Sequence, residues 1–598
     1  MTLVSSSTMA MDAEKQTDAV VDKPSSEEDV TTTEHVNDVL TRTDTYLDDQ
    51  HVKLGWRTWL VVNLTQVFVV TAAGQVIAFI IRDLGNPGLA GWIIQGPLVM
   101  QSALSPIVGR LSDVFDRKWV LSIPYIFSFV GACISARATD MNTLIGGGIL
   151  IGICLATLPL LLAIPSEILP MKYRPISGGI AFFGGACGGL IGILGAGAVT
   201  NQSVHGWRNI FWLQAALHGI TFIGLVLFYN PIRRSDYPKM SFKGYIWSLD
   251  PIGSALFVSG TTLILLGLDW TSGSYPWKSS HVLAPLCLGI ILIIIFGFYE
   301  WKCRVDGLVA HAFFKRGRNF ALGLFGFAVE GWMFYSAVNS VTPQLVLNLG
   351  WETTAWDNAT RQMTYQIPAI IGSWIISAYA TKYKELKYPL VICFTLFLIS
   401  SIFYATVSPT ENHAQMGINV LTGFGQAGPL TLITPIIQYS SPHALLATAS
   451  GLAAVVRAVG GAFGSAVLDA IANGHLSSTL DPSVSRAATM AGLPASSVPA
   501  LLAAFAAGTG FDSVPGINST ILEAASDASH WEYAHAYRLA WSSVIPFVAL
   551  AIIGILCLTD VKEMMTEHVE ASVEPGAAQQ VANHEASHEA SHEANHKA

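Results

Sequence analysis

Long apolar stretches separated by short polar connections occupy the chain from residue 59 to residue 558. A membrane-spanning α-helix needs about 20 mostly apolar residues to cross the hydrocarbon core of a bilayer. Fourteen stretches meet this requirement: 59–81, 89–109, 119–138, 143–164, 176–199, 210–229, 249–268, 281–301, 319–341, 364–381, 388–407, 415–438, 447–470 and 537–558. The pattern therefore predicts an all-α polytopic membrane protein with fourteen transmembrane helices.

The composition agrees with this interpretation. Of 598 residues, 52% are hydrophobic and only 12% are charged, whereas a typical soluble domain has about 25% charged residues. The net charge of −9 is concentrated at the ends, because residues 1–58 carry 12 acidic and 5 basic side chains and residues 559–598 carry 8 and 2. We expect a disordered N-terminal tail at 1–58 and a low-complexity C-terminal tail at 559–598.

The basic residues of the short loops indicate the orientation. Cytosolic loops of membrane proteins are enriched in Lys and Arg. If the N-terminus is cytosolic, the main basic clusters all fall on the inner side: 110–118, 172–174, 233–243, 302–318 and 382–387. Both termini are then cytosolic and the segment 471–536 is an external loop. We expect a multi-pass protein of the plasma membrane or of a vesicle or vacuole membrane.

An internal repeat relates the two ends of the apolar region. Pro159 and Pro165 have the same spacing as Pro429 and Pro435, and glycines of the fifth predicted helix match those of the thirteenth, as Gly179 matches Gly451. The repeat predicts three parts: a six-helix bundle at 59–229, a linker with two extra helices at 230–318, and a second six-helix bundle at 319–558. Parallel repeats of this kind place a substrate site near the middle of the membrane, between the two halves.

The loop after the second predicted helix carries the most specific motif, Gly109-Arg110-Leu111-Ser112-Asp113-Val114-Phe115-Asp116-Arg117-Lys118. It resembles the signature G-x-L-a-D-r-x-G-r-k of the major facilitator superfamily, with Asp116 in place of a glycine. The resemblance implies the major facilitator fold, here with 14 helices arranged 6+2+6. It also implies a conformational latch, to which we add Glu167: Gly109, Arg110, Asp113, Arg117, Lys118 and Glu167. A plain basic cytosolic loop is the alternative.

The fifth predicted helix contains nine glycines between residues 178 and 197. Small residues allow membrane helices to pack backbone to backbone. The cluster loosely resembles the antiporter signature g-x-x-x-G-P-x-x-G-G of the superfamily, without its proline, and generic close packing explains it equally well. We expect helix packing at Gly184, Gly188, Gly189 and Gly192.

Further short segments narrow the resemblance: Ala73-Gly74-Gln75, Trp92-Ile93, Pro165-Ser166-Glu167 and Trp207-Arg208. Together with the 6+2+6 layout, they resemble the 14-helix drug:proton antiporter branch and, within it, the fungal trichothecene efflux pump family. The resemblance covers most of residues 50–560. It implies a secondary active transporter that exports a trichothecene-type sesquiterpenoid toxin in exchange for protons, for self-protection and toxin secretion.

Two ionisable residues, Glu330 and Arg457, fall in the middle of predicted helices. A charge at membrane depth is costly and usually functional. Glu330 can carry a proton, because desolvation favours its neutral form, and Arg457 can hold a substrate oxygen or pair with a carboxylate. The alternative is a structural ion pair, including one between these two residues.

A neutral, oxygenated substrate requires an apolar cavity with a few hydrogen-bonding groups. The candidates for lining such a cavity are Gln66, Gln75, Gln95, Trp332, Tyr335 and Gln426. Amide side chains also join membrane helices to each other, which is the alternative role for each glutamine.

Other sequence motifs, present or missing, narrow the predicted function further. Three sequons in predicted external loops make Asn201, Asn358 and Asn518 candidate glycosylation sites. The sequence contains no P-loop and no catalytic or metal-ligand motif, so we expect neither an ATP-driven pump nor an enzyme, and no cofactor, metal or nucleic-acid partner. The expected partners are a small-molecule substrate, protons and the bilayer, with a monomeric transport unit.

Two alternatives stay open. The same fold also serves ferric siderophore uptake and multidrug transport, because alternating access works in either direction. A transporter-like membrane sensor is the alternative from another class, although the tails at 1–58 and 559–598 are short for a signalling domain.

Overall fold

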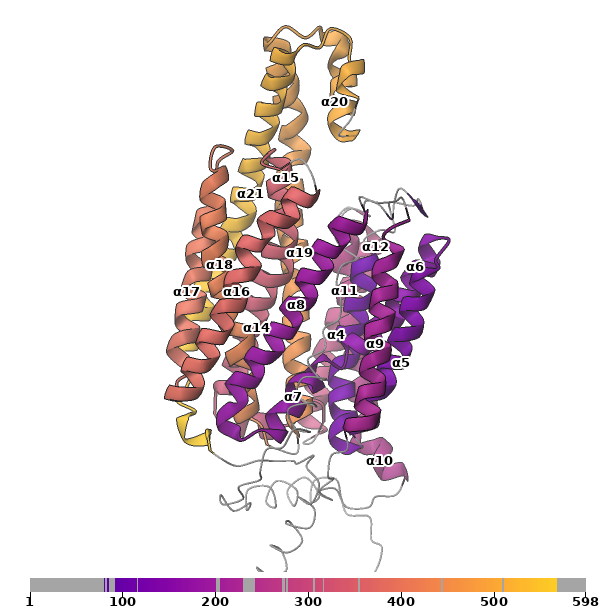
Figure 1. Ribbon diagram of the computed structural model, residues 1–598, viewed down its shortest axis with the longest axis vertical. Coiled ribbons are helices and arrows are strands. Elements are labelled where there is room, and N and C mark those ends of the chain that lie inside the picture. Colours follow the sequence, from indigo (N-terminus) through magenta and orange to yellow (C-terminus); the bar gives the residue numbers. More distant parts are fainter. Residues whose placement is uncertain are drawn as a thin grey trace, which may run out of the picture.

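The computed structural model describes most of the chain beyond residue 91. The described residues are 80, 83–84 and 92–566, without 116, 201–204, 230–241, 272–274, 276–277, 305–306, 316, 353–354, 443–444 and 508–509. Over these residues every regular element is a helix, and the helices stand side by side in a tall bundle (Figure 1). The predicted all-α class is confirmed. Except for Ile80, the helix predicted at 59–81 lies outside the described residues, as does the tail at 1–58.

The first half of the bundle contains six described helices: α4 (Trp92–Val114), α5 (Arg117–Ala136), α6 (Met141–Leu155), α7 (Leu158–Ile168), α8 (Arg174–Thr200) and α9 (Arg208–Phe228). The helix predicted at 143–164 is divided into α6 and α7. Pro159 lies at the start of α7, where its missing N–H is tolerated because the first turn of a helix leaves its N–H groups unbonded. Three residues of 3₁₀ helix, η3 (Met171–Tyr173), lead into α8.

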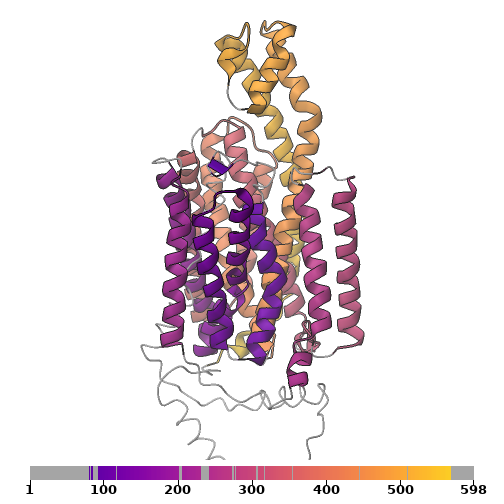
Figure 2. The same ribbon diagram turned by 90° about the vertical axis from the view of Figure 1, so that its right-hand side faces the viewer.

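The two extra helices lie at one edge of the bundle (Figure 2). They are α11 (Pro251–Thr271) and α12 (Ser280–Lys302), preceded by the short helix α10 (Phe242–Ser248). Helix α11 packs against α4 and α19, whereas α12 packs mainly against α11. The large apolar side chains of α12, such as Ile294 at 65% exposure, are thus available to lipid.

The second half contains the remaining helices: α13 (Ala312–Lys315), α14 (Asn319–Gly331), η4 (Trp332–Val341), α15 (Thr342–Asn348), α16 (Ala355–Tyr383), α17 (Lys387–Tyr404), α18 (Asn412–Tyr439), α19 (Leu446–Met490), α20 (Val498–Ala507) and α21 (Ser519–Leu556). The segment η4 is a π-helix that continues α14 without a break. Within the described residues, nine helical segments are long and apolar enough to cross a membrane. The total of fourteen stays a prediction.

The segment expected as an external loop at 471–536 is largely helical. Helix α19 continues to Met490 and α21 begins at Ser519, so the two helices run beyond the predicted limits and form, with α20, a projection at one end of the bundle (Figure 1). Val484, Leu501 and Ile521 are buried in a small core of its own. The loop prediction was wrong there because apolar runs mark the membrane-embedded part of a helix and not its end.

The internal sequence repeat also relates the positions at which two helices begin. Helix α8 begins at Arg174 and α19 begins at Leu446, which is the same offset that separates Gly179 from Gly451 in the sequence. The two halves are in direct contact at this level, because Leu446 and Ala447 of α19 belong to an apolar cluster formed mainly by α4 to α9. The N-terminal end of α19 is therefore a joint between the halves.

Candidate functional site

Glu330 of α14 and Arg457 of α19 form a buried ion pair. Arg457 donates from Nε to Glu330 Oε2 over 2.5 Å and from Nη2 to Glu330 Oε1 over 2.8 Å. Glu330 is 0% exposed and Arg457 is 6% exposed. This two-pronged geometry is the strongest form of a carboxylate–guanidinium contact, and the sequence left it open as one of several roles.

Polar and aromatic groups from other helices surround the pair. Gln426 of α18 donates from Nε2 to Glu330 Oε1 over 2.5 Å, and Arg457 donates from Nη1 to the Tyr335 hydroxyl over 3.0 Å. The guanidinium also lies 4.6 Å from the ring centre of Phe334 and 4.8 Å from that of Tyr335, within the range of cation–π attraction. The cluster thus compensates a charge that would otherwise be costly in this environment.

Glycines allow the two helices that carry the pair to approach. A Cβ added at Gly331 would overlap the carbonyl oxygen of Arg457, and one at Gly460 would overlap that of Ala328. Gly331 is also the residue at which α14 passes into the π-helix η4, a distortion that is frequent at functional sites. The backbone therefore places Glu330 and Tyr335 on either side of the same guanidinium.

Two polar groups of this cluster are left without a hydrogen bond. The Oε1 atom of Gln426 and the hydroxyl of Tyr365 on α16 are buried and have no hydrogen-bond partner among the described residues. Tyr365 is near enough to interact electrostatically with both Glu330 and Arg457. Buried polar groups in proteins are normally satisfied, so these two offer hydrogen-bonding capacity for water or for a polar group of a ligand. No signal in the sequence marks Tyr365, because tyrosine is common in apolar helices.

Asp113 at the end of α4 holds the first turn of α19. Its Oδ2 atom accepts from the backbone N–H of Thr448 over 2.9 Å and from the Thr448 hydroxyl over 2.7 Å, and Oδ1 accepts from the N–H of Ala447 over 3.3 Å. The first N–H groups of a helix are free within the helix and carry partial positive charge. Asp113 therefore acts as a cap supplied by the other half of the molecule.

The other latch candidates lie around Asp113. Arg117 donates to Asp113 Oδ1 over 3.1 Å and also forms an ion pair with Glu167 of α7. A Cβ at Gly109 would lie 2.6 Å from the carbonyl oxygen of Ala447, so a larger residue would separate α4 from α19. Arg110 donates to the carbonyl of Ser248 over 2.9 Å, which joins the latch to α10.

Lys118 lies further from the centre of the latch. Its Nζ atom is 5.8 Å from the ring centre of Trp119. Asp116, at which the motif departs from the family signature, lies outside the described residues.

The close contacts of the glycine-rich helix α8 differ from those expected. No described atom lies within 4 Å of a Cβ added at Gly189, whereas Cβ atoms at Gly178 and Gly179 would contact Thr431 and Ser377 of the second half. The described residues therefore do not supply the packing expected at Gly189, and the close contacts occur near the start of α8. Gly188 is buried and Gly184 is half-buried. Gly192 lies on the same helix.

The residues predicted to line a substrate cavity lie in different parts of the structure. Gln426 and Tyr335 belong to the charged cluster described above. Trp332 is 4% exposed and packs between the rings of Phe463 and Phe547, 5.6 and 4.8 Å away, so it faces α21 and is not a cavity wall in this structure. Gln95 is part of α4, and Gln66 and Gln75 lie outside the described residues.

The glycosylation candidates also differ from one another. Asn518 is exposed and caps α21 by accepting from the N–H of Ile521 over 2.8 Å. Asn358 lies in the first turn of α16 and is only half-exposed, because α16 begins before the helix predicted at 364–381. Asn201 lies outside the described residues.

The Trp207-Arg208 motif has a clear structural role at the end of the first half that lies away from the latch. Asp83 Oδ2 accepts from Trp207 Nε1 over 2.9 Å and from Arg208 Nη1 over 2.7 Å. Burial by itself would raise the pKa of Asp83, but hydrogen bonds from His205 and Trp207 and the charge of Arg208 lower it. The motif thus fixes the start of α9 to the connection before α4.

Comparison with known proteins identifies the class. The family model of the Major Facilitator Superfamily matches residues 59–465. The chain belongs to this superfamily, which confirms the resemblance seen in its latch motif and makes it a multi-pass membrane transporter, not an enzyme.

Among individual proteins, the chain is similar to two fungal transporters. It is 25% identical over 523 residues to the trichothecene efflux pump TRI12 of Fusarium sporotrichioides, covering 84% of this chain and 85% of that protein. It is 27% identical over 455 residues to the acurin A biosynthesis cluster MFS-type transporter of Aspergillus aculeatus, covering 72% and 78%.

A solved structure also aligns along most of the chain. The human organic anion transporter MFSD10 aligns at 11% identity with a TM-score of 0.48, over 87% of this chain and 99% of that one.

Proposed function

We propose that this protein is a proton-coupled exporter of apolar, oxygenated fungal metabolites of the trichothecene type. The observation that carries the proposal is the buried Glu330–Arg457 pair, the kind of charged site at membrane depth that marks a coupling or substrate site. The named efflux function of the TRI12 relative supports the substrate class. The protein acts as a monomer in the plasma membrane or a vesicle or vacuole membrane, with both termini in the cytosol.

The pair supports proton coupling because a proton and Arg457 compete for the Glu330 carboxylate. When Glu330 is ionised, it binds Arg457 in two places and the cluster is neutral overall. When Glu330 takes up a proton, the attraction to Arg457 falls, and the guanidinium becomes available to a hydroxyl or carbonyl oxygen of a substrate. Proton and substrate then alternate at one site, as exchange in opposite directions requires.

Helix α19 links this site to the latch. Thr448 contacts Asp113 and Arg457 contacts Glu330, and nine residues of α-helix separate them by about 14 Å. A helix transmits a shift along its axis, so release of Arg457 on one side weakens the cap at Thr448 on the other. We infer that the state described here, with Asp113 bound to α19, is closed on the latch side.

Transport in a toxin-sensitive yeast tests the proposal. Cells that express the protein should grow at higher trichothecene concentrations and hold less toxin than cells that express Glu330→Gln at the same surface level. Dissipating the proton gradient should remove the difference. Unchanged toxin accumulation, combined with increased ferric siderophore uptake, would establish the uptake function and overturn export.

A further inference from the structure

The described part of the chain continues beyond the end of α21 at Leu556. Leu558 to Thr566, including the 3₁₀ turn η8 (Lys562–Met564), folds back against the end of the bundle; we call these residues the strap. Leu558, Val561 and Met565 are buried at 5%, 4% and 0% exposure and belong to the core of the second half. The strap was expected to be part of a solvated tail beginning at residue 559, and burial of these apolar side chains explains why it is not.

Specific hydrogen bonds fix the strap to the second half. Asn319 at the start of α14 accepts from the N–H and the hydroxyl of Thr559 over 2.8 and 2.9 Å and donates to its carbonyl over 3.0 Å. Lys387 donates to the carbonyl of Leu558 over 3.2 Å, and Lys384 donates to that of Met565 over 2.7 Å. The strap is therefore held at both ends by side chains of its own half.

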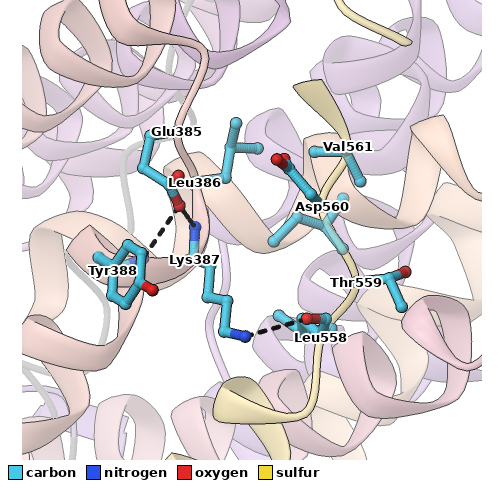
Figure 3. Close-up of a pocket in the computed structure, with 9 residues that line it drawn as sticks. Glu385, Leu386, Lys387, Tyr388, Leu558, Thr559, Asp560 and Val561 are labelled. Carbon is cyan, nitrogen blue, oxygen red and sulfur yellow. Dashed lines mark hydrogen bonds between the residues drawn. The ribbon is translucent and has the colours of Figure 1, made fainter. Parts of the chain in front are cut away.

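A small cavity separates the strap from the start of α17. Its volume is about 150 Å³, and Glu385, Lys387 and Asp560 are among the residues that line it (Figure 3). Contact along the strap is thus discontinuous, with anchored ends and a gap between Asp560 and α17. Detachment of the strap therefore requires exposure of Val561 and Met565, which are buried in the core of the second half.

The far end of the strap crosses to the first half. The N–H of Lys172 in η3 donates to the carbonyl of Thr566 over 2.9 Å, and the Thr566 hydroxyl lies 3.6 Å from the sulfur of Met171. Tyr439 of α18 reinforces the contact by donating to the carbonyl of Met171 over 2.6 Å. The strap therefore contacts the segment just before α8, whereas Asp113 contacts the first turn of α19, which the internal repeat relates to the first turn of α8.

The internal repeat relates Asp113 to a carboxylate that lies beside the strap. At the offset that relates the start of α8 to the start of α19, Asp113 corresponds to Glu385. Asp113 binds the first turn of α19 in the other half. Glu385 instead accepts from the N–H groups of Lys387 and Tyr388 over 3.1 and 3.4 Å, at the start of its own helix.

We propose that the strap is the second latch of this transporter. It joins the second half to η3 of the first half while Asp113 joins the first half to α19. Both joints lie at the same end of the bundle (Figure 1). Opening of this end requires the release of Thr566 from Lys172 as well as of Thr448 from Asp113.

Amide hydrogen exchange of the full-length protein in lipid nanodiscs tests the second latch. Met565→Gln places a polar side chain in a fully buried position, and Asn319→Ala removes the anchor of Thr559. We expect several-fold faster exchange at Lys172 and also at Thr448 in both variants, because the two latches hold one closure. Glu563→Gln, an exposed change in the same segment, is the matched control and should leave both amides unchanged.

If the amides of the strap exchange faster in the Met565 or Asn319 variant while Lys172 and Thr448 keep their protection, the strap is a passive cover. Asn319→Ala decides the question if Met565→Gln fails to fold. The readout requires no substrate, so failure of the proposed export function leaves this result intact.

Discussion

Two buried carboxylates, Glu330 and Asp113, are neutralised in different ways. Glu330 is bound by a cationic side chain and an amide within the second half, whereas Asp113 is bound by Arg117 of its own half and by two backbone N–H groups and a hydroxyl at the start of a helix from the other half. A side-chain partner can be exchanged for a proton or a substrate oxygen. A helix end can only be held or released. One carboxylate is therefore suited to chemistry and the other to conformation, and α19 connects them.

The largest expected effect comes from breaking the pair on one side. Arg457→Gln leaves the carboxylate of Glu330 buried without its cation, which costs about 3–5 kcal/mol in comparable pairs. We expect loss of transport and a clear drop in thermal stability in detergent. The double variant Glu330→Gln/Arg457→Gln should regain most of the stability and none of the transport. Equal stability of the single and double variants would contradict an ion pair at this site.

The next largest effect concerns the latch. Asp113→Asn removes the negative charge that Arg117 and the first turn of α19 share, at a cost of about 1–3 kcal/mol. Because no group proposed to contact the substrate is changed, we expect slower transport with a smaller change in substrate affinity. Asp481→Asn, an exposed change on the projection, is the control. If Asp113→Asn lowers substrate affinity as strongly as the transport rate, the division between the two carboxylates is wrong.

Gly331 and Gly189 differ in how closely other atoms surround them. Gly331→Ala forces a methyl group against the carbonyl of Arg457, whereas Gly189→Ala meets no described atom within 4 Å. Overpacking in a tight core costs roughly 1–3 kcal/mol, so we expect reduced stability and transport for Gly331→Ala only. Thermal unfolding and surface expression measured in parallel would show whether Gly189 packs against another helix in a second conformation.

The smallest expected effect comes from Asp83, at the end of the first half away from the latch. Its lowered pKa means that its contribution to stability is present at neutral pH and is lost as the pH falls through the folded-state value, below 3.8. Asp83→Asn should therefore reduce the melting temperature slightly at pH 7, and the difference from wild type should vanish at strongly acidic pH. A difference that persists there would point to lost packing and not to lost charge.

Much of the architecture followed from the sequence. The apolar runs located the helices, and the internal repeat correctly related the starts of α8 and α19. Glu330 and Arg457 were singled out because a lone charge within an apolar helix is a strong local signal, and Asp113 because its loop resembles the superfamily signature. The extension of α19 to Met490 and the strap were missed, because both depend on packing outside the predicted spans.

The residues that are expensive to bury could be identified along the chain, because solvation cost is a property of each side chain and its local run. How that cost is met depends on contacts between distant helices. Glu330 and Arg457 are 127 positions apart, and Asp113 and Thr448 are 335 apart, so no local pattern relates them. Their pairing depends on glycine contacts and helix ends that meet only when the two halves are assembled.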